Sequence, residues 1–331
     1  MRSTGLTTLF FLAVAACSRT ADELPQGEGA TTLAPGTYRR SVEHDGRQRS
    51  YIVHVPPQAA AGDPLPVILD FHGGGGNAQG QREYSGMDSL ADEACLLAVY
   101  PDGTGRFEGL LTWNAGGCCG SAREEEVDDV GFTRALIADL EAVAAIDRRR
   151  IYATGLSNGA MMAYRLAAEA SDLVTAIAPV AGAMSLEGFH PSRAVPILHI
   201  HSVDDPRALY QGGLGPPFPI TTRGVKHAPV EVVLDRWAEN NGCATEPEVT
   251  EIRSSRPDSA GEGPNHTASH LVYPDCDPGG DVELWRLTGA GHVWPGGIPK
   301  YLNAILGAST DVIDANREMW AFFERFELPA K

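Results

Sequence analysis

The chain has 331 residues, of which 43% are hydrophobic and 21% are charged. These values are ordinary for a globular protein with a sizeable core, and the length suits one large domain or two small ones. The formal net charge is −17, and the sequence contains no block of five or more basic residues. An acidic surface argues against nucleic acid or an anionic membrane as the main partner.

The first 17 residues have the pattern of an export signal. A basic Arg2 precedes an apolar run from Leu9 to Ala16, which is too short to cross a bilayer as a helix. The four residues VAAC, which end at Cys17, resemble a bacterial lipobox, in which the cysteine is lipidated and becomes the mature N-terminus. We therefore predict an exported protein, extracellular or periplasmic, with Cys17 as its lipidation site. It would then be an outer-membrane lipoprotein that contacts the membrane only through this anchor. A non-lipidated signal peptide cut near the same place is the alternative.

Residues 18–34 lack apolar periodicity and predict a flexible tether, whereas residues 35–331 predict one domain. Helical spacing of apolar residues predicts helices over 130–146, 158–170 and 311–326, with Asp128 and Asp129 in front of the first as cap and dipole partners. The expected strands are 47–56, 65–73, 95–103, 149–155, 173–182, 194–203 and 281–292. Several of these strands are apolar throughout, which is typical of parallel strands that are buried on both faces. The fold class is therefore α/β, with a mostly parallel sheet and helices on both faces. The polar stretch 251–270 is predicted to be a surface excursion within this domain.

Setting Cys17 aside leaves five cysteines, Cys95, Cys118, Cys119, Cys243 and Cys276. Export permits disulfides, and an odd count means that at least one cysteine is free or paired between chains. Cys243 and Cys276 flank a polar insertion, so we expect this pair first. Cys118 and Cys119 are adjacent and no C-x-x-C pair occurs, which is the wrong spacing for structural zinc. No metal site is therefore expected.

The residues GLSNG at 155–159 match the pattern G-x-S-x-G between a predicted strand and a predicted helix. Such a turn is sharp, so side chains at Gly155 and Gly159 would clash with neighbouring elements. It would raise the hydroxyl of Ser157 above the sheet edge and place the N–H of Asn158 at a helix start. The pattern thus predicts Ser157 as a nucleophile. The alternative is a turn serine that only caps the helix.

A serine hydroxyl is a weak nucleophile at neutral pH and needs a base. His292 lies in the glycine-rich segment GAGHVWPGG, just after the last predicted strand. In this type of fold the chain order is serine, acid, histidine, so the acid should lie between the other two. Asp204 and Asp205 follow a predicted strand, and either could orient the imidazole. Their spacing does not choose between them.

The loop HGGGGNA, which begins at His72, supplies glycines that let the backbone approach a substrate closely. An oxyanion hole needs N–H donors, and we expect one from Asn158 and one from this loop. A rival interpretation is a dinucleotide fingerprint formed by the glycines and alanine of G-x-G-x-x-A, with an acid for the ribose. Its residues are Gly73, Gly75, Ala78 and Glu93. It leaves the serine, acid and histidine series unexplained, so no cofactor is expected.

Taken together, the segments HGGGGNA, TWNAGGCCG, VDDVGF, GLSNGAMMAY, HSVDDPRALY and GAGHVWPGG resemble the bacterial poly(3-hydroxybutyrate) depolymerase and feruloyl esterase group of α/β-hydrolases. The matches run in order from about residue 37 to residue 325. The resemblance implies the α/β-hydrolase fold and a serine esterase with Ser157 as nucleophile and His292 as base. The acid loop of this group usually reads H-G-T-x-D-x-x-x-P-Y, which places the acid at Asp205. The chain departs from that pattern at Ser202, Val203 and Leu209.

By the same analogy Gly74 is the oxyanion donor from the glycine loop, and Tyr210 and Trp294 contact the substrate. Trp113, in TWNAGGCCG, is either a wall of this pocket or a core residue. The implied reaction is metal-free ester hydrolysis through an acyl-enzyme, on hydroxybutyrate oligomers or polymer, or on feruloyl or acetyl groups of polysaccharides. A serine peptidase of the same fold and a non-catalytic binding lipoprotein are the alternatives. The sequence indicates no oligomeric state.

Overall fold

The computed structural model describes residues 33–59, 64–107, 109–217, 224–255, 265–298 and 303–329. The predicted signal segment with Cys17, and the tether up to residue 32, lie outside the described residues. Among the described residues, no helix has both the length and the apolar character needed to cross a membrane.

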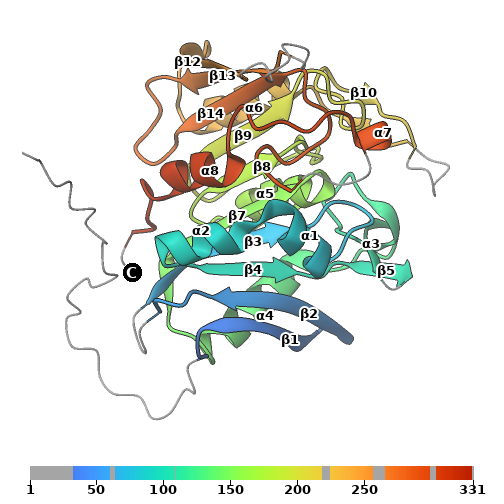
Figure 1. The fold of residues 1–331 in the computed structure, drawn as a ribbon, viewed down its shortest axis with the longest axis vertical. Helices are drawn as coiled ribbons and strands as arrows, with labels where there is room; N and C mark the ends of the chain where they lie inside the picture. Colours follow the sequence, from blue (N-terminus) through green and yellow to red (C-terminus); the bar gives the residue numbers. More distant parts are fainter. Residues whose placement is uncertain are drawn as a thin grey trace, which may run out of the picture.

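A ten-stranded sheet runs through the described part of the chain (Figure 1). Its strands, in spatial order, are β1 (Gly36–His44), β2 (Arg47–Val55), β4 (Leu97–Pro101), β3 (Leu65–Phe71), β7 (Ile146–Leu156), β8 (Ile177–Val180), β9 (Ile197–Ser202), β14 (Val282–Thr288), β13 (Thr267–Tyr273) and β12 (Glu248–Ser254). The central strands from β4 to β14 are parallel to one another, and antiparallel pairs close both edges. The carboxyl ends of the parallel strands therefore meet at one edge of the sheet.

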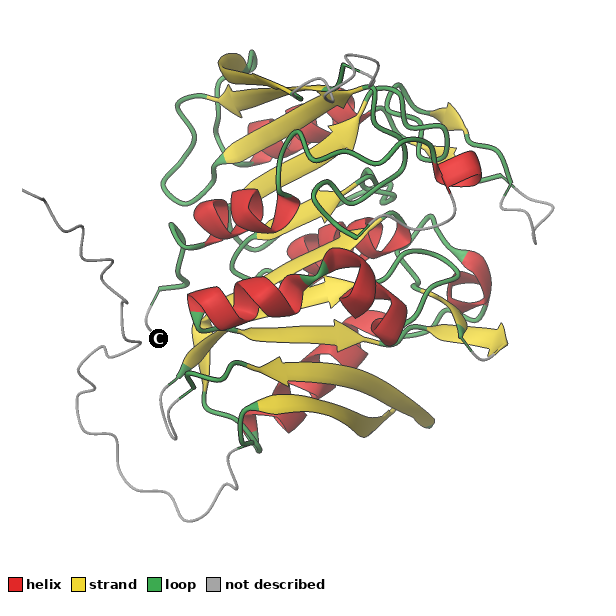
Figure 2. Cartoon of the chain, in the orientation of Figure 1, coloured by secondary structure: helices red, strands yellow, loops and turns green. Residues whose placement is uncertain are grey.

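Helices cover both faces of this sheet (Figure 2). On one face lie α1 (Ala78–Ser85), α2 (Met87–Ala94) and α8 (Ala315–Phe323), and on the other lie α4 (Asp129–Glu141), α5 (Asn158–Glu169) and α6 (Val230–Asn240). The carboxyl edge carries short elements, namely α3 (Gly120–Glu124), α7 (Asn303–Leu306) and the small pairs β5 (Thr104–Phe107) with β6 (Leu110–Thr112) and β10 (Gly213–Leu214) with β11 (Lys226–His227).

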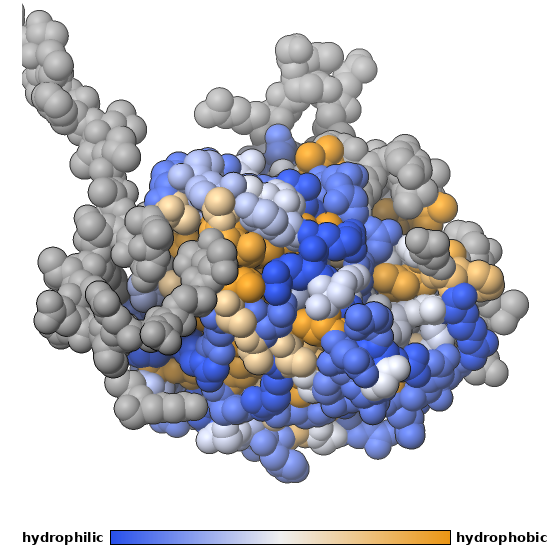
Figure 3. Space-filling view, turned by 90° about the horizontal axis from the view of Figure 1, so that it is seen from below, coloured by the Kyte–Doolittle hydropathy of each residue, from blue (hydrophilic) through white to orange (hydrophobic). Residues whose placement is uncertain are grey.

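Two apolar cores hold the layers together, one on each face of the sheet. Tyr152 of β7 stacks on Phe323 of α8 with ring centroids 4.6 Å apart, and Tyr164 of α5 lies 6.1 Å from Trp237 of α6 on the opposite face. All residues of β3 are buried, as expected for a central parallel strand. The outer face seen in Figure 3 is mostly hydrophilic, with smaller apolar areas between the polar ones.

The expected strands and helices are present with small shifts in their ends, and the predicted fold class is confirmed. Asp128 caps α4 by accepting a hydrogen bond from Gly131 N at 2.8 Å. Asp129 lies in the first turn of α4, as expected of a dipole partner, and is also buried against Arg49. The polar stretch 251–270, predicted to be a surface excursion within the domain, carries part of the exposed strand β12 at one end and part of β13 at the other. Since β12 is an exposed edge strand, its residues lack the apolar pattern by which buried strands are found.

Cys243 and Cys276 form the disulfide that was expected first. Cys118 and Cys119 are bonded to each other, and Cys95 is also disulfide-bonded. None of the cysteines in the described part of the chain is free, which rules out the first of the two expected alternatives, a free cysteine, for the described residues.

Candidate active site

Three parallel strands deliver the predicted catalytic residues to the same edge of the sheet. Ser157 directly follows β7, Asp205 follows β9, and His292 follows β14. The order β7-β8-β9-β14 separates the outer two of these strands by three spacings of about 4.8 Å, roughly 14 Å in total. Loops and long side chains can bridge that distance at the carboxyl edge, which is where ligands bind in open α/β sheets.

Ser157 occupies a strained turn between β7 and α5. Its φ of 57° and ψ of −112° lie outside the regions that a residue with a side chain usually adopts. A Cβ atom on Gly155 would come within 2.5 Å of the carbonyl oxygen of Phe71, and one on Gly159 would clash with the same oxygen. Glycine is thus required on both sides of the serine because β3 passes directly beside the turn.

The hydroxyl of Ser157 is not used to cap α5. Ser157 stands at the N-cap position, but its side chain makes no capping hydrogen bond. Its backbone N–H donates to the carbonyl of Val180 in β8 at 2.9 Å, which holds the turn against the neighbouring strand. The side chain is partly exposed at the carboxyl edge. The capping alternative therefore does not describe this serine.

The buried carboxylate of Asp205 faces His292. Oδ2 of Asp205 lies 2.7 Å from Nδ1 of His292, while Oδ1 accepts hydrogen bonds from the amides of Arg207 at 2.7 Å and Ala208 at 2.8 Å. Asp204 is exposed, and its carboxylate accepts instead from Gly289 N at 2.7 Å. The two adjacent aspartates thus have different roles: Asp205 contacts the imidazole, and Asp204 fastens the loop that carries it.

The surroundings of Asp205 favour its ionised form. Burial opposes ionisation of this carboxyl, but the neighbouring His292 and hydrogen bonds from His201 and His292 outweigh burial and hold its pKa well below the ordinary value. A charged Asp205 fixes the proton of His292 on Nδ1 and leaves Nε2 as the free base. No hydrogen bond joins Ser157 to His292 in the described structure, and catalytic hydrogen bonds of this kind often tighten only when substrate is bound.

The glycine loop lies directly against the serine turn. A Cβ on Gly73 would lie 3.6 Å from Cβ of Ser157, and a Cβ on Gly74 would lie 3.6 Å from Cβ of Asn158. The N–H groups of Gly75 and Gly76 donate to the carbonyls of Leu111 and Gly73. Within the described residues the N–H of Gly74 makes no such bond, which leaves it available at the place where Asn158 begins α5.

His72 holds this loop in place with both of its ring nitrogens. Its Nε2 accepts a hydrogen bond from Gly103 N at 3.0 Å, so the ring proton lies on Nδ1, which donates to Gly73 O at 2.8 Å. Burial lowers the pKa of His72 to about 4, so the ring is neutral at physiological pH. In the rival dinucleotide interpretation Glu93 would hold a ribose, but its carboxylate pairs with Arg317 at 2.8 Å.

Trp113 and Asn158 tie the glycine loop to the nucleophile helix. The indole N–H of Trp113 donates to His72 O at 2.9 Å, and the side-chain amide of Asn158 makes two hydrogen bonds to the backbone of Trp113, at 2.7 and 3.1 Å. The ring of Trp113 also meets Phe71 edge-on at 5.0 Å. This use of the Asn158 side chain was not foreseen, because the sequence indicated a role only for its backbone.

The three aromatic residues expected to contact substrate are all buried. Trp113 has no exposed surface, and Tyr210 and Trp294 are each 2% exposed. The hydroxyl of Tyr210 donates to Glu231 at 2.9 Å, and the indole N–H of Trp294 donates to Asn316 at 2.9 Å. Substrate contact by these rings stays a prediction. In the structure, Tyr210 and Trp294 make hydrogen bonds that hold the loops on which they lie.

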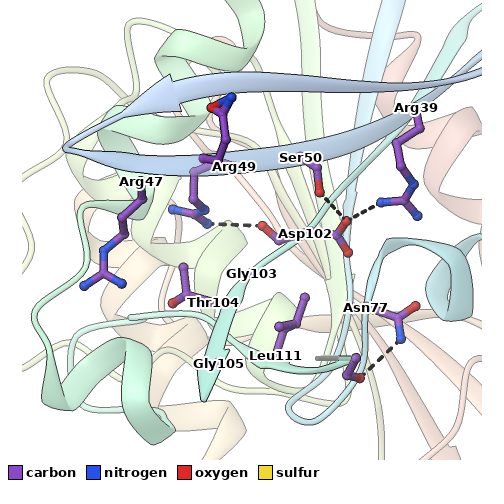
Figure 4. A pocket seen from close by; sticks show the side chains of 12 residues that line it. Arg39, Arg47, Arg49, Ser50, Asn77, Asp102, Gly103, Thr104, Gly105 and Leu111 are labelled. Atoms are coloured by element: carbon purple, nitrogen blue, oxygen red, sulfur yellow. Dashed lines mark hydrogen bonds and ion pairs between the residues drawn. The ribbon is translucent and has the colours of Figure 1, made fainter. Parts of the chain in front are cut away.

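A cavity of about 610 Å³ is lined by residues of the β1–β2 hairpin and by Asn77, Asp102 and Thr104 (Figure 4). Its lining includes three arginines, each of which is paired with an acid. The pairs are Arg39 with Asp102, Arg47 with Glu125 and Arg49 with Asp129, at 2.7, 3.0 and 2.7 Å. This pairing neutralises the arginines and leaves no surplus charge for an anionic substrate. Asp102 also accepts from the N–H of Ala78, and so anchors the start of α1 behind the glycine loop.

A parallel sheet covered on both faces, with a serine at a sharp strand-to-helix turn on its carboxyl edge, defines an α/β-hydrolase. The chain belongs to the family described as "Esterase PHB depolymerase", whose model matches residues 49–221. It is accordingly a hydrolase that acts on carboxylic esters.

Curated relatives agree with this assignment. "Putative esterase NocK" of Nocardia uniformis subsp. tsuyamanensis is 32% identical over 85% of this chain and 79% of its own length. "Feruloyl esterase B" of Piromyces equi is 30% identical over 74% of this chain, and the chain spans 42% of that protein. "Feruloyl esterase D" of Neurospora crassa is 26% identical over 97% of both chains. Among solved structures, "Acetyl xylan esterase from Aspergillus awamori" aligns with 81% of this chain and 97% of its own, at 14% identity and a TM-score of 0.49.

Proposed function

We propose that the chain hydrolyses its ester through Ser157, His292 and Asp205. The observation that carries this proposal is the 2.7 Å contact between Nδ1 of His292 and the buried carboxylate of Asp205, at the sheet edge where the strained turn raises Ser157. Each partner has the form that nucleophilic catalysis needs: an ionised acid, a base with its proton on Nδ1, and a hydroxyl that is not used for capping.

The reaction then follows in two steps. His292 Nε2 takes the proton of Ser157 as the hydroxyl oxygen attacks the ester carbonyl, and the negative charge moves to the carbonyl oxygen. The N–H groups of Gly74 and Asn158 stabilise that oxygen, because both are backbone donors next to the serine. His292 gives its proton to the departing alcohol, which leaves an acyl group on Ser157. Water, deprotonated by His292, then releases the acid and restores the serine.

The substrate class that we favour is a feruloyl or acetyl ester on a polysaccharide. Relatives that align with most of this chain are named feruloyl esterases, and a further one is named a bifunctional acetylxylan esterase/xylanase. Large apolar side chains are exposed on the small strand pairs beside the carboxyl edge, namely Phe107, Leu110 and Leu214. Such side chains suit an aromatic acyl group better than a charged one. Hydrolysis of hydroxybutyrate oligomers is the other outcome, and a panel of methyl ferulate, acetylated xylan and these oligomers distinguishes the two.

We also propose that residues 1–17 direct export, that Cys17 is lipidated, and that residues 18–34 tether the esterase domain at 35–331. The supporting observations are the apolar run that ends in a lipobox-like sequence and the low apolar content of the segment after it. Disulfides within the domain fit a protein that works outside the reducing cytoplasm.

Substitution of the nucleophile tests the mechanism. Ser157→Ala should lower kcat/KM for p-nitrophenyl acetate by at least about 10³-fold, because the remaining oxyanion donors and binding contacts give only residual catalysis. Ser171→Ala, a change at a serine whose hydroxyl bonds Ser192, is the matched control and should keep near wild-type rates. Wild-type turnover by Ser157→Ala would refute the mechanism. A fluorophosphonate probe separates an active serine from a binding protein, and peptide substrates separate an esterase from a peptidase.

A further inference from the structure

A row of buried polar side chains runs from α5 to Asp205. Tyr164 of α5 lies with Oη 3.0 Å from Nδ1 of His199, and Nε2 of His199 lies 3.0 Å from Nδ1 of His201. Nε2 of His201 then faces two acceptors, the carbonyl oxygen of Ala208 at 2.8 Å and Oδ2 of Asp205 at 3.3 Å. All four side chains are buried, and the two histidines share one face of β9 because they are two residues apart.

These contacts restrict where the hydrogens lie. Nε2 of His201 must carry a proton, since both of its neighbours are acceptors. Burial lowers the pKa of His199 well below its ordinary value, so His199 is neutral and donates from only one nitrogen. If His199 donated to Tyr164 instead of His201, His201 would have to donate from both nitrogens and carry a charge. A buried positive charge on His201 would be costly, because the nearby His292 also becomes positive during the reaction.

The neutral arrangement satisfies every member of the row. The Tyr164 hydroxyl donates to His199, His199 donates from Nε2 to His201, and His201 donates from Nε2 to Ala208 O and Asp205. Burial raises the pKa of Tyr164 well above its ordinary value, so its hydroxyl keeps its proton. The row therefore has one direction, from the nucleophile helix toward the catalytic acid, and it ends at the oxygen of Asp205 that also receives His292.

We propose that His201 is a positioning residue that sets the basicity of His292 through Asp205. Oδ2 of Asp205 is shared by two imidazoles, and Oδ1 is held by two backbone amides, so the carboxylate cannot turn. The N–H of His201 also withdraws negative charge from the oxygen that stabilises the His292 imidazolium. Removing that N–H would therefore leave Asp205 with a stronger hold on the imidazolium form of His292. This inference rests on the proposed function.

Two matched polar substitutions separate the hydrogen bond to Asp205 from the rest of the row. In His201→Gln the side-chain amide can reach the position of Nε2 and can still donate to Asp205. In His201→Asn the amide reaches only the position of Nδ1, so the contact with His199 can remain while the donor to Asp205 is lost. Tyr164→Phe removes a buried hydrogen bond at the far end of the row and leaves Asp205 untouched.

The readout is the acid limb of the pH profile of kcat/KM for p-nitrophenyl acetate, which reports the pKa of the essential base in the free enzyme. We expect His201→Asn to move this limb upward by about one pH unit, a tenfold loss of rate on the acid side. His201→Gln should restore the wild-type position. Tyr164→Phe should lower the melting temperature without moving the limb. If the row had only a structural role, His201→Asn would also lower the melting temperature and leave the limb in place. An unmoved limb in His201→Asn, or an equal shift in Tyr164→Phe, would overturn the proposal.

A measurement on the wild-type chain keeps the proposal testable if the His201 variants do not fold. Nitrogen NMR of the histidine side chains should show His201 protonated on Nε2 and unprotonated on Nδ1, and a proton on Nδ1 of His201 would contradict it. Failure of the proposed function gives a different result, since Ser157→Ala would then keep its activity. If turnover depends on Ser157 but the acid limb does not depend on His201, only the role of His201 is refuted.

Discussion

Replacing His72 by asparagine should weaken both the fold and the oxyanion site. The asparagine amide can still donate to Gly73 O, but nothing would then accept the hydrogen bond from the N–H of Gly103. Leaving a buried donor without a partner costs about 1–3 kcal/mol, so the free energy of unfolding at pH 7.5 should fall by that amount. Because Gly73 precedes Gly74, kcat should fall by roughly 10–100-fold while KM changes little.

The pH dependence gives this prediction a sharper form. Burial lowers the pKa of His72 from 6.5 to about 4 in the folded chain, so protons bind the unfolded chain more tightly. The contribution of neutral His72 to stability is therefore complete above pH 6.5 and is lost as the pH falls toward 4. A pH of 5 lies 1.5 units below the pKa of the unfolded chain, and each unit corresponds to about 1.4 kcal/mol. At this pH the free energy of unfolding of the wild type should therefore have fallen by about 2 kcal/mol through His72.

Urea unfolding at pH 7.5 and pH 5 measures both effects. His72→Asn has no imidazole at this position, so the difference in unfolding free energy between wild type and variant should shrink by about 2 kcal/mol between the two pH values. The exposed His190 provides the control, since His190→Asn should leave the pH dependence unchanged. A difference between wild type and His72→Asn that stays constant with pH would refute the assignment of His72 as a neutral, buried loop anchor.

Two further predictions concern the acid and the N-terminus. Asp205→Asn should lower kcat by roughly 10⁴-fold, because an amide stabilises neither the charged imidazole nor its required tautomer. Asp204→Asn keeps an oxygen that can accept from Gly289 N and should lose only a few-fold, and equal losses in both variants would contradict the assignment of Asp205. Mass spectrometry of the mature protein should find an acylated N-terminus at Cys17, and Cys17→Ala should move the protein from the membrane to the soluble fraction. An unmodified N-terminus would instead indicate an ordinary signal peptide.

The central part of the fold could be predicted because its strands are buried on both faces. Such strands are mostly apolar, and short apolar runs mark β3 and β9 even though each strand also carries buried polar side chains. β1 and β12 could not be found in the same way. Residues of β1 alternate between half-buried and exposed, and those of β12 are nearly all exposed. β12 pairs with β13 across a polar segment, so local composition carries little signal there. β1 is joined to β2 by Asp45 and Gly46 alone, and this Asp-Gly turn is a local hairpin signal that apolar runs do not reveal.

The residues of the site also fall into those that a local sequence pattern predicts and those that depend on distant parts of the chain. Ser157 stands out because a sharp turn beside β3 demands glycine on both sides, and this demand is local. The choice between Asp204 and Asp205 is not local, because it depends on which carboxylate the loop after β14 approaches. His201 was missed because a buried histidine within an apolar strand leaves no periodic signal. Its role becomes visible only when Ala208 and Asp205 fold back over it.

Burial separates the groups that set the chemistry from those that can choose the ester. Asp205 and His292, with the row that begins at Tyr164, are buried and held by hydrogen bonds, so their geometry is fixed before any substrate arrives. The exposed apolar side chains near the carboxyl edge, Phe107 and Leu214, lie on short strand pairs that make few contacts with the central sheet. Changes there cost little stability and do not disturb the hydrogen bonds of the buried groups. Substrate preference can therefore vary at this edge while the catalytic geometry stays the same.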